Sequence, residues 1–262
     1  MSSEQDQAKE INKQMQDPMP KVSSPLPGTF NLLAGIQDPD TGEWSDAAVV
    51  RELTGRDEEH FDILRKKEGL TYTDFYTAIV VAGLVSVGGT PSDAKLVDRL
   101  IEADRNLVFL ETLKATYGTD RDIVRYCPHC NAKNDITIEL DQDFPIKGTD
   151  IDLRAPLEVK TSKGTFKLRL PNGADLAAGA RGKTTSESST AIISRVLVFE
   201  EGEEPFNREE YTKDLNFGVR KELFNALLEV EAGPDMGEVD TQCATCGEDM
   251  PIAFDWVSLL LG

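Results

Sequence analysis

The chain has 262 residues, and its 28 basic and 47 acidic side chains give a formal net charge of −19 at pH 7. This acidity disfavours nucleic-acid phosphates and anionic membrane surfaces as main partners. The longest apolar run, residues 78–87, is too short for a bilayer, which takes about 20 residues, and the N-terminus has no apolar stretch typical of a signal peptide. We therefore expect a soluble protein made in a reducing compartment, where thiols stay free.

Residues 1–29 are polar and rich in proline toward their end, so they cannot bury enough apolar surface to fold alone. We expect a flexible N-terminal arm. Two interpretations remain open for this arm: a free tail, or a segment that becomes ordered on a neighbouring subunit.

The next part of the chain is predicted to alternate between strand and helix. A strand over residues 47–53 ends in a turn at Thr54-Gly55, after which acidic residues favour a helix start. Apolar periodicity and turn residues predict helices over 57–67, 74–87, 93–103 and 104–117, with Gly118 as a C-terminal cap. The helix over 74–87 is apolar almost all round and should be buried. Alternation predicts a strand over 136–140.

The second part of the chain follows a similar order. We predict a strand over 166–170, a loop or weak helix over 177–190 and a helix over 190–200. Asn207 can cap a further helix, and residues 219–231 form the last predicted helix, which ends at Gly233. A strand is predicted over 252–256.

The order of strand, Gly-Asp turn, helices, C-x-x-C pair and strand therefore occurs twice. The two Gly-Asp turns and the two cysteine pairs are separated by nearly the same number of residues. We predict an internally duplicated α+β chain, with a first half over residues 30–150 and a second half over 151–262. The alternative is chance agreement between two α+β segments.

All four cysteines belong to two C-x-x-C pairs, Cys127 with Cys130 and Cys243 with Cys246, each placed between a predicted helix and a predicted strand. Two such pairs supply the four thiolates of a tetrahedral, zinc-ribbon-like site, because the two-residue spacer lets both sulfurs of a pair face one point. A closed shell of four thiolates leaves no position for a substrate, so the site would be structural. One zinc ion shared between the halves is the simplest arrangement, although four thiolates also accept iron.

Other interpretations of the cysteines remain. The sequence Cys127-Pro128-His129-Cys130 also occurs in thiol–disulfide oxidoreductases, which place the first cysteine at a helix N-terminus. Here residues 131–134 have turn composition, which favours a zinc knuckle, and redox chemistry leaves the second pair unexplained. Two structural disulfides are the third interpretation, which the lack of a secretion signal disfavours. We expect His129 to be an exposed knuckle residue.

Residues typical of catalysis are scarce. The chain has two histidines, and His60 lies among acidic residues on a helix face that we expect to be solvated. Neither a P-loop nor a dinucleotide-binding fingerprint occurs, and no nucleophile has a base in its local context. We therefore expect no enzymatic activity and assign no catalytic residues.

Taken in order, these motifs resemble the baseplate proteins of T-even-type tailed bacteriophages, a family that includes a hub component or hub-assembly factor. The resemblance covers roughly residues 30–262, and it departs from common zinc knuckles at Ala244, where proline is frequent. It rests on Asp57-Glu58-Glu59 after Thr54-Gly55, Asp104-Arg105 on a leucine-rich helix ending Thr116-Tyr117-Gly118, the sequence from Leu168 to Asp175, and both cysteine pairs.

The resemblance implies a structural component of a virion tail baseplate, synthesised in the host cytoplasm. Such a protein would bind neighbouring tail proteins in a multi-subunit assembly, with the N-terminal arm as one candidate contact. Residues 78–87 and 256–261 are candidates for the core first and for contact surfaces second. The alternatives are an assembly chaperone absent from the mature virion and, less favoured by the acidity, a zinc-ribbon nucleic-acid-binding module.

Overall fold

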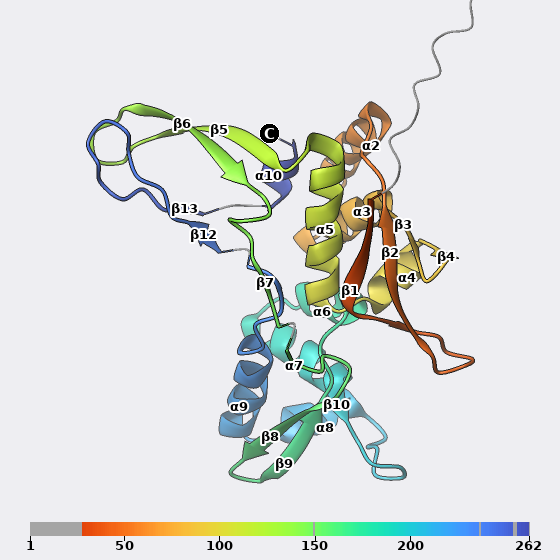
Figure 1. The fold of residues 1–262 in the computed structure, drawn as a ribbon. Helices are drawn as coiled ribbons and strands as arrows, with labels where there is room; N and C mark the ends of the chain where they lie inside the picture. Colours follow the sequence, from red (N-terminus) through yellow and green to blue (C-terminus); the bar gives the residue numbers. More distant parts are fainter. Residues whose placement is uncertain (1–27, 149, 236, 254–255, 262) are drawn as a thin grey trace, which may run out of the picture.

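A computed structural model describes residues 28–148, 150–235, 237–253 and 256–261. These residues form helices and several small antiparallel sheets, so the predicted α+β class is confirmed (Figure 1). The predicted arm lies outside the described residues except for Gly28 and Thr29, which belong to the first strand. Within the described ranges, every helix is too short or too polar to cross a membrane.

The first half is built on a four-stranded antiparallel sheet with the strand order β1-β2-β3-β4. Its inner face is apolar because Ala48 and Val50 of β2 and Val87 of β3 are fully buried. The opposite face is directed toward solvent, as the alternation of side chains along a strand requires. The strands are β1 (Gly28–Gln37), β2 (Trp44–Val50), β3 (Leu84–Val87) and β4 (Thr90–Pro91).

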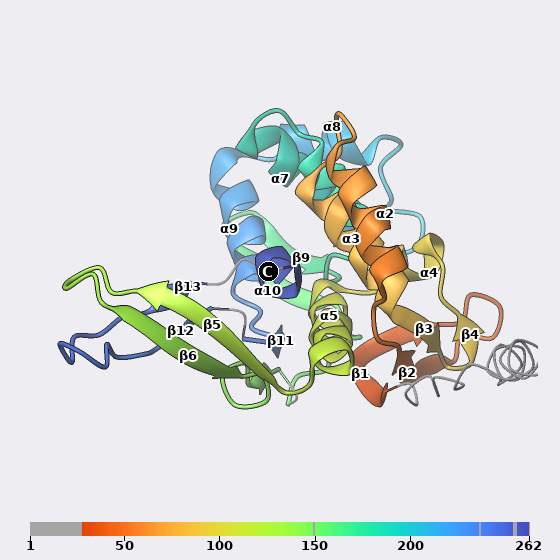
Figure 2. The ribbon, with the colours of Figure 1, turned by 90° about the horizontal axis from the view of Figure 1, so that it is seen from above.

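Helices cover the inner face of this sheet, and α5 lies at the centre of the molecule, in contact with β1, β2, α3 and β11 (Figures 1 and 2). Capping boxes begin α2 and α3, where Asp57 and Asp74 each accept a hydrogen bond from the backbone of the N-cap residue. Gly118 ends α5 with φ 86°, as predicted. The helices are α2 (Gly55–Arg65), α3 (Tyr72–Gly83), α4 (Ala94–Arg99) and α5 (Glu102–Tyr117).

Two predicted helix boundaries in this half are wrong. The helix predicted over 74–87 ends at Gly83, because Leu84 pairs with Val50 and residues 84–87 become β3. Pairing with β2 decides the conformation of this apolar segment, which helix and strand patterns both fit. The junction between the next two helices lies at Leu100 and Ile101, earlier than predicted, since both have extended backbone.

The described residues of the second half contain a three-stranded sheet in the order β10-β9-β8, the helices α6 to α9, and α10 near the C-terminus. The region 177–190, predicted as a loop or weak helix, is helical at both ends, since it holds the end of α6 and the start of α7, whose N-cap is Thr184. Asn207 caps α8 as predicted. The elements are β8 (Leu157–Thr161), β9 (Gly164–Leu168), α6 (Gly173–Ala180), α7 (Thr185–Val196), β10 (Leu197–Val198), α8 (Arg208–Asp214) and α9 (Phe217–Leu228).

Each half has its own hydrophobic core. The larger core fills the first half and includes Ile79 and Val80, so these members of the apolar run serve the interior. It also includes Val257, Leu259 and Leu260 of α10 (Trp256–Leu261). The C-terminal helix of the second half therefore packs into the core of the first half.

Short two-stranded sheets connect and extend the halves. The hairpin β5–β6 and the pair β12–β13 lie side by side and project from the body of the molecule (Figures 1 and 2). Three expectations are corrected here. Each cysteine pair follows a strand instead of a helix, and residues 133–134 belong to β6. Of the strand predicted over 252–256, Ile252 and Ala253 form β13, residues 254–255 lie outside the described part of the chain, and Trp256 begins α10. The strands are β5 (Asp120–Tyr126), β6 (Lys133–Glu139), β7 (Ile146–Lys147), β11 (Gly233–Pro234), β12 (Glu238–Val239) and β13 (Ile252–Ala253).

Candidate metal centre

The two C-x-x-C segments fold into turns of the same form. In the first turn the N–H of Asn131 donates to the carbonyl of Cys127 at 2.9 Å, and in the second the N–H of Gly247 donates to that of Cys243 at 2.8 Å. Both donors have left-handed backbone, with φ 57° at Asn131 and 75° at Gly247. Asn and Gly tolerate this conformation best, so the residue after each second cysteine suits the turn.

All four predicted ligands meet at one place. The sulfur atoms of Cys127, Cys130, Cys243 and Cys246 lie within 4.8 Å of one another, close enough to bind a metal ion. Between the pairs, Cys127 Sγ lies 3.7 Å from Cys246 Sγ, and Cys130 Sγ lies 3.6 Å from Cys243 Sγ. A tetrahedron with Zn–S bonds of 2.3 Å has sulfur–sulfur edges of about 3.8 Å, so these spacings match zinc coordination.

The thiols differ in burial and electrostatics. Cys127 and Cys243 are each 2% exposed, whereas Cys130 and Cys246 are exposed. Backbone N–H groups of Cys246 and Thr245 lower the pKa of Cys243 to about 6. The backbone N–H of Glu248 acts in the same direction at Cys246, but partial burial and three neighbouring thiols raise the pKa of Cys246 to about 12. Four thiolates at this spacing therefore need a bound cation.

The geometry separates the three interpretations of the cysteines. Cys127 follows the end of β5, whereas an oxidoreductase places its first cysteine at a helix N-terminus. All four cysteines are free, and the cross-pair sulfur distances of 3.6 and 3.7 Å exceed the roughly 2.05 Å of a disulfide bond. His129 is exposed on the first turn, as expected. The arrangement fits a metal site best.

Asn134 belongs to the site, although the sequence analysis placed it only in a segment of turn composition. Its Oδ1 accepts the N–H of Ala244 at 2.9 Å, and its Nδ2 donates to the carbonyl of Ala132 at 3.0 Å and lies 3.6 Å from Cys243 Sγ. The side chain is 4% exposed and so links the two turns from within. Its alternation with Ile136 and Ile138 along β6 is the signal that places it on the inner face.

The chain beyond the second turn is tied to the first half. The Tyr117 hydroxyl donates to the carbonyl of Leu260 at 2.7 Å, and Arg121 donates to that of Leu259 at 3.0 Å. Arg121 also lies over the Tyr117 ring, 4.0 Å from its centroid. These contacts lie at the base of the β5–β6 hairpin, where α10 enters the first core, whereas the first cysteine turn lies at the opposite end of the hairpin (Figure 1).

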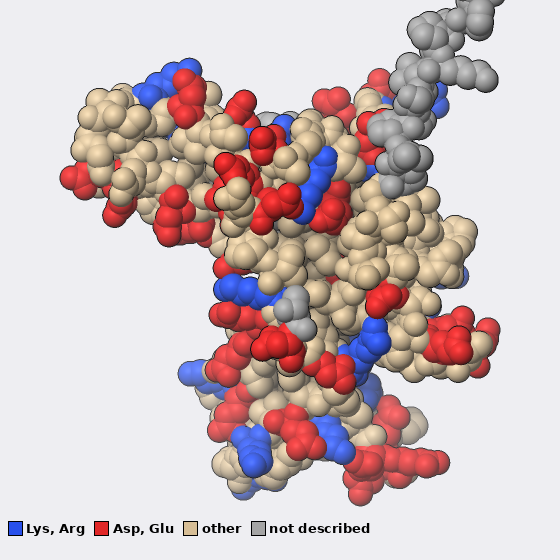
Figure 3. Space-filling model, in the orientation of Figure 1, with Lys and Arg blue, Asp and Glu red and all other residues tan. Residues whose placement is uncertain are grey.

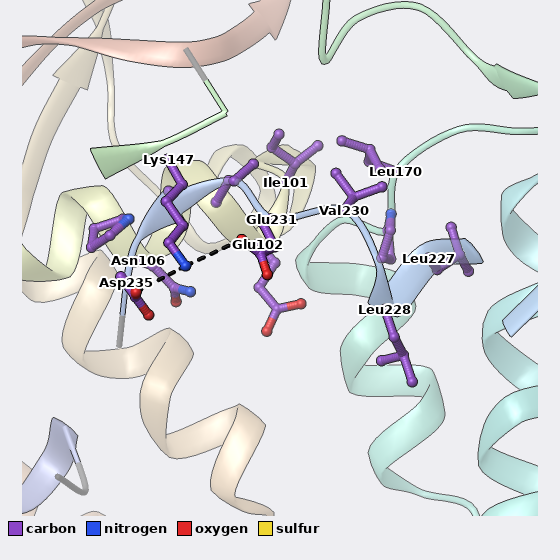
Figure 4. A pocket seen from close by; sticks show the side chains of 15 residues that line it. Ile101, Glu102, Asn106, Lys147, Leu170, Leu227, Leu228, Val230, Glu231 and Asp235 are labelled. Carbon is purple, nitrogen blue, oxygen red and sulfur yellow. Dashed lines mark hydrogen bonds and ion pairs between the residues drawn. The ribbon is translucent and has the colours of Figure 1, made fainter. Parts of the chain in front are cut away.

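A separate cavity of about 380 Å³ lies between the halves, at α5, β7, β11 and the end of α9 (Figure 4). Its cation, Lys147, forms ion pairs with Asp235 at 2.9 Å and with Glu231 at 3.1 Å. The hydrogen bond to Asp235 has the largest effect on the pKa of Lys147, followed by that to Glu231, and both raise it. A nucleophilic lysine needs the opposite shift, so Lys147 is held as a charged structural group.

The fold and the site define an α+β chain in which four cysteines, two from each predicted half, are close enough to bind one metal ion. Comparison with protein-family models, with curated proteins and with solved structures finds no match to this chain.

Proposed function

We propose that the chain is a structural subunit of a bacteriophage tail baseplate, stapled by one zinc ion at Cys127, Cys130, Cys243 and Cys246. The observation that carries the proposal is the meeting of two C-x-x-C pairs from distant parts of the chain: the contact between Cys127 and Cys246 spans 119 positions. The assignment to a baseplate is supported by the ordered set of motifs that resembles that family. Neighbouring tail proteins would be its partners.

Zinc suits the site because its ligand preference and geometry fit four thiolates at the observed sulfur spacing. All four positions of a tetrahedron would be filled by protein, so the ion would hold structure and bind no substrate. Asn134 supports this role, since it links both turns and donates toward a ligand sulfur. Iron is the other metal that this donor set accepts.

An internal duplication is supported by a similar element order, since β1-β2-α2-α3-β3-β4-α4-α5 corresponds to β8-β9-α6-α7-β10-α8-α9 except for the two-residue strand β4, which has no counterpart among the described residues. One ion pair recurs in detail. Arg51 contacts both carboxylate oxygens of Asp57, and Arg169 does the same with Asp175, six positions later in each case. Each arginine also donates to the carbonyl of the residue that follows it. Two unrelated α+β segments would have no reason to share this ion pair and the hydrogen bond that accompanies it.

A structural role without catalysis is supported by the groups that could otherwise react. His60 and His129 are exposed side chains on the surface. Lys147 is held between two carboxylates, and the four thiols would be ligands of a closed site. In the proposed role, Lys147 and the four thiols therefore stabilise the fold and do not react with a substrate.

One face suits contact with a neighbouring subunit. Figure 3 shows an area without charged side chains over β1 and β2, in contrast to the acidic surface around it. Thr29 pairs with Val49 and Asn31 with Ala47, so these four uncharged side chains share the outer face of the sheet. An uncharged sheet face can be covered by a partner without desolvating charge.

The experiment is elemental mass spectrometry of the purified native protein, with a thiol count under denaturation. We expect one zinc per chain and four reduced thiols. Absence of metal together with one oxidised pair would overturn the zinc proposal in favour of a thiol oxidoreductase. Mass spectrometry of purified virions tests the assignment to a baseplate. Detection of the chain supports a virion component. Absence of the chain from virions, together with its presence in assembling tails, indicates an assembly chaperone.

A further inference from the structure

A second cavity, of about 430 Å³, lies where the β1–β2 hairpin, the end of α4 and the second half meet. Its lining includes Arg99, Arg154 and Arg169 together with Trp44. Three guanidinium groups thus gather at one cavity of a chain in which acidic residues outnumber basic ones 47 to 28. The metal centre uses none of these residues, so the cavity requires its own explanation.

Arg169 is fully engaged in the structure. Its two terminal nitrogens contact the carboxylate of Asp175 at 2.6 and 3.1 Å and also donate to the carbonyls of Leu170 and Arg195. Asp175 is completely buried, so this pair fixes the wall of the cavity that the second half provides.

Arg99 and Arg154 are different, because most of their donors are not used by the protein. Arg99 donates to the carbonyl of Gln37, and Arg154 donates through Nε to the carbonyl of Ala34 at 2.9 Å. Within the described part of the chain, Asp46 is the only carboxylate at ion-pair distance from either guanidinium, 3.7 Å from Arg154, and the charges of Arg99 and Arg154 act on Asp38 and Asp104, respectively, from farther away. A guanidinium has five N–H donors, so each arginine retains several for a ligand.

The two arginines are nevertheless held in place. The Arg154 guanidinium lies 5.0 Å from the centroid of the Trp44 ring, and its Nε bond fixes the side chain from the other side. The nearby carboxylate of Asp38 accepts the N–H groups of Asp40 and Thr41, both at 2.8 Å, and so is engaged in its own turn. Forked donors held in this way are pre-organised for an anion.

We propose that this cavity binds an oxyanion, a carboxylate or phosphate group, through Arg99 and Arg154. A planar guanidinium matches both groups by paired N–H···O bonds, and Trp44 and Leu153 provide an uncharged wall for the remainder of the ligand. The proposal goes beyond the structural role, which needs no ligand other than the metal. The negative net charge of the chain repels anions in general, so an anion would bind only where a local site such as this one recognises it.

The test is isothermal titration calorimetry of the full chain with sodium phosphate and, separately, with sodium citrate, at constant ionic strength. We expect saturable binding of at least one anion and, over the same concentration range, a change in tryptophan fluorescence that a Trp44→Phe variant lacks. The double variant Arg99→Gln/Arg154→Gln should raise the Kd at least about tenfold, because it loses the charge-assisted hydrogen bonds to the anion. The control Arg56→Gln/Lys67→Gln removes the same charge from two exposed positions, one on α2 and one just after its C-terminal end, and should bind like the wild type.

The outcomes are separable. Binding of phosphate alone, of citrate alone or of both supports the site and identifies its preferred oxyanion. Lack of saturable binding to the wild type, or equal binding by the two double variants, overturns the proposal. If circular dichroism shows that the first double variant is unfolded, Arg99→Gln alone decides the question, because it keeps the bond from Arg154 to Ala34.

Discussion

At the scale of single residues, two buried polar side chains organise their surroundings. Asn134 joins the two cysteine turns, and Asp104 accepts the N–H groups of Leu33, Ala34 and Gly35 where the pairing of β1 with β2 is interrupted. Each buried side chain satisfies backbone donors of another segment. Both residues therefore determine the local shape through hydrogen bonds to segments that are remote from them in the sequence.

Replacement of Asn134 by alanine should weaken the metal centre. The N–H of Ala244 would lose its acceptor, which costs about 1–3 kcal/mol of folding stability, and metal affinity should fall about 10- to 100-fold. Competition with a chromophoric zinc chelator measures the affinity. Thr137→Ala, an exposed change on the same strand, is the control, and equal affinity of both variants would contradict the role of Asn134.

Asp104 should make stability depend on pH. Burial raises its pKa from 3.8 to about 6, although three backbone N–H groups act in the opposite direction. A carboxyl whose pKa is raised by folding stabilises the folded state below the unfolded pKa, and this contribution is lost as pH rises through the folded pKa. We expect a loss of about 3 kcal/mol between about pH 4 and pH 6–7.

Denaturant unfolding of the wild type and of Asp104→Asn over this pH range tests the expectation. The free energy of unfolding of the wild type minus that of the variant should fall by about 3 kcal/mol as pH rises, because the variant lacks the titrating group. Other carboxylates and the metal site contribute equally to both proteins and cancel. Parallel pH profiles would show that Asp104 keeps an ordinary pKa.

At the scale of elements, the same ion pair serves two helices in different surroundings. Asp57 begins α2 and is 15% exposed, with Arg51 as its partner. Asp175 begins α6, is completely buried and pairs with both Arg169 and Arg195. Because its surroundings exclude water, the Asp175 cluster should contribute more to stability.

Alanine substitutions at the two positions give a matched comparison. We expect Asp175→Ala to reduce the free energy of unfolding by about 3 kcal/mol, since it leaves two arginines without their carboxylate. Asp57→Ala should cost about 1 kcal/mol, in keeping with a partly exposed pair. Chemical denaturation of both variants measures the values, and a larger loss at Asp57 would refute the explanation by burial.

At the scale of the whole molecule, one metal site lies between distant segments. Cys130 and Cys243 are 113 positions apart, and closing such a loop costs a few kcal/mol, roughly, on general scaling. Structural zinc contributes about 10–16 kcal/mol in small finger peptides, which exceeds that cost. The site can therefore hold the two cysteine turns together, and with them the segment that leads from the second turn through β13 to α10.

Loss of the metal should loosen the whole chain. We expect Cys127→Ser, or treatment with a chelator, to lower the Tm and to speed amide exchange in α10 as well as in β5 and β6. Differential scanning calorimetry and hydrogen exchange by mass spectrometry measure these effects. His129→Ala should leave both unchanged, and a Cys127→Ser variant with wild-type Tm and zinc content would disprove the staple.

Features that depend on a few neighbouring residues could be predicted from the sequence. The C-x-x-C spacing already directs two sulfurs to one point, Gly118 ends α5 by its positive φ, and Asn207 caps α8 through its own side chain. These features follow from side-chain chemistry and local backbone preference, which a short segment contains in full.

Only the tertiary structure decided the rest. Residues 84–87 are a strand because β2 lies beside them, and α6 and α7 form in a segment of weak helix propensity because Ile193 and Val196 find a core. The bridging role of Asn134 and the gathering of Arg99 and Arg154 likewise depend on segments remote in sequence. Local composition determines what each segment can form, whereas packing and pairing between segments determine which form is adopted, because burial and hydrogen bonds from distant partners outweigh local preference.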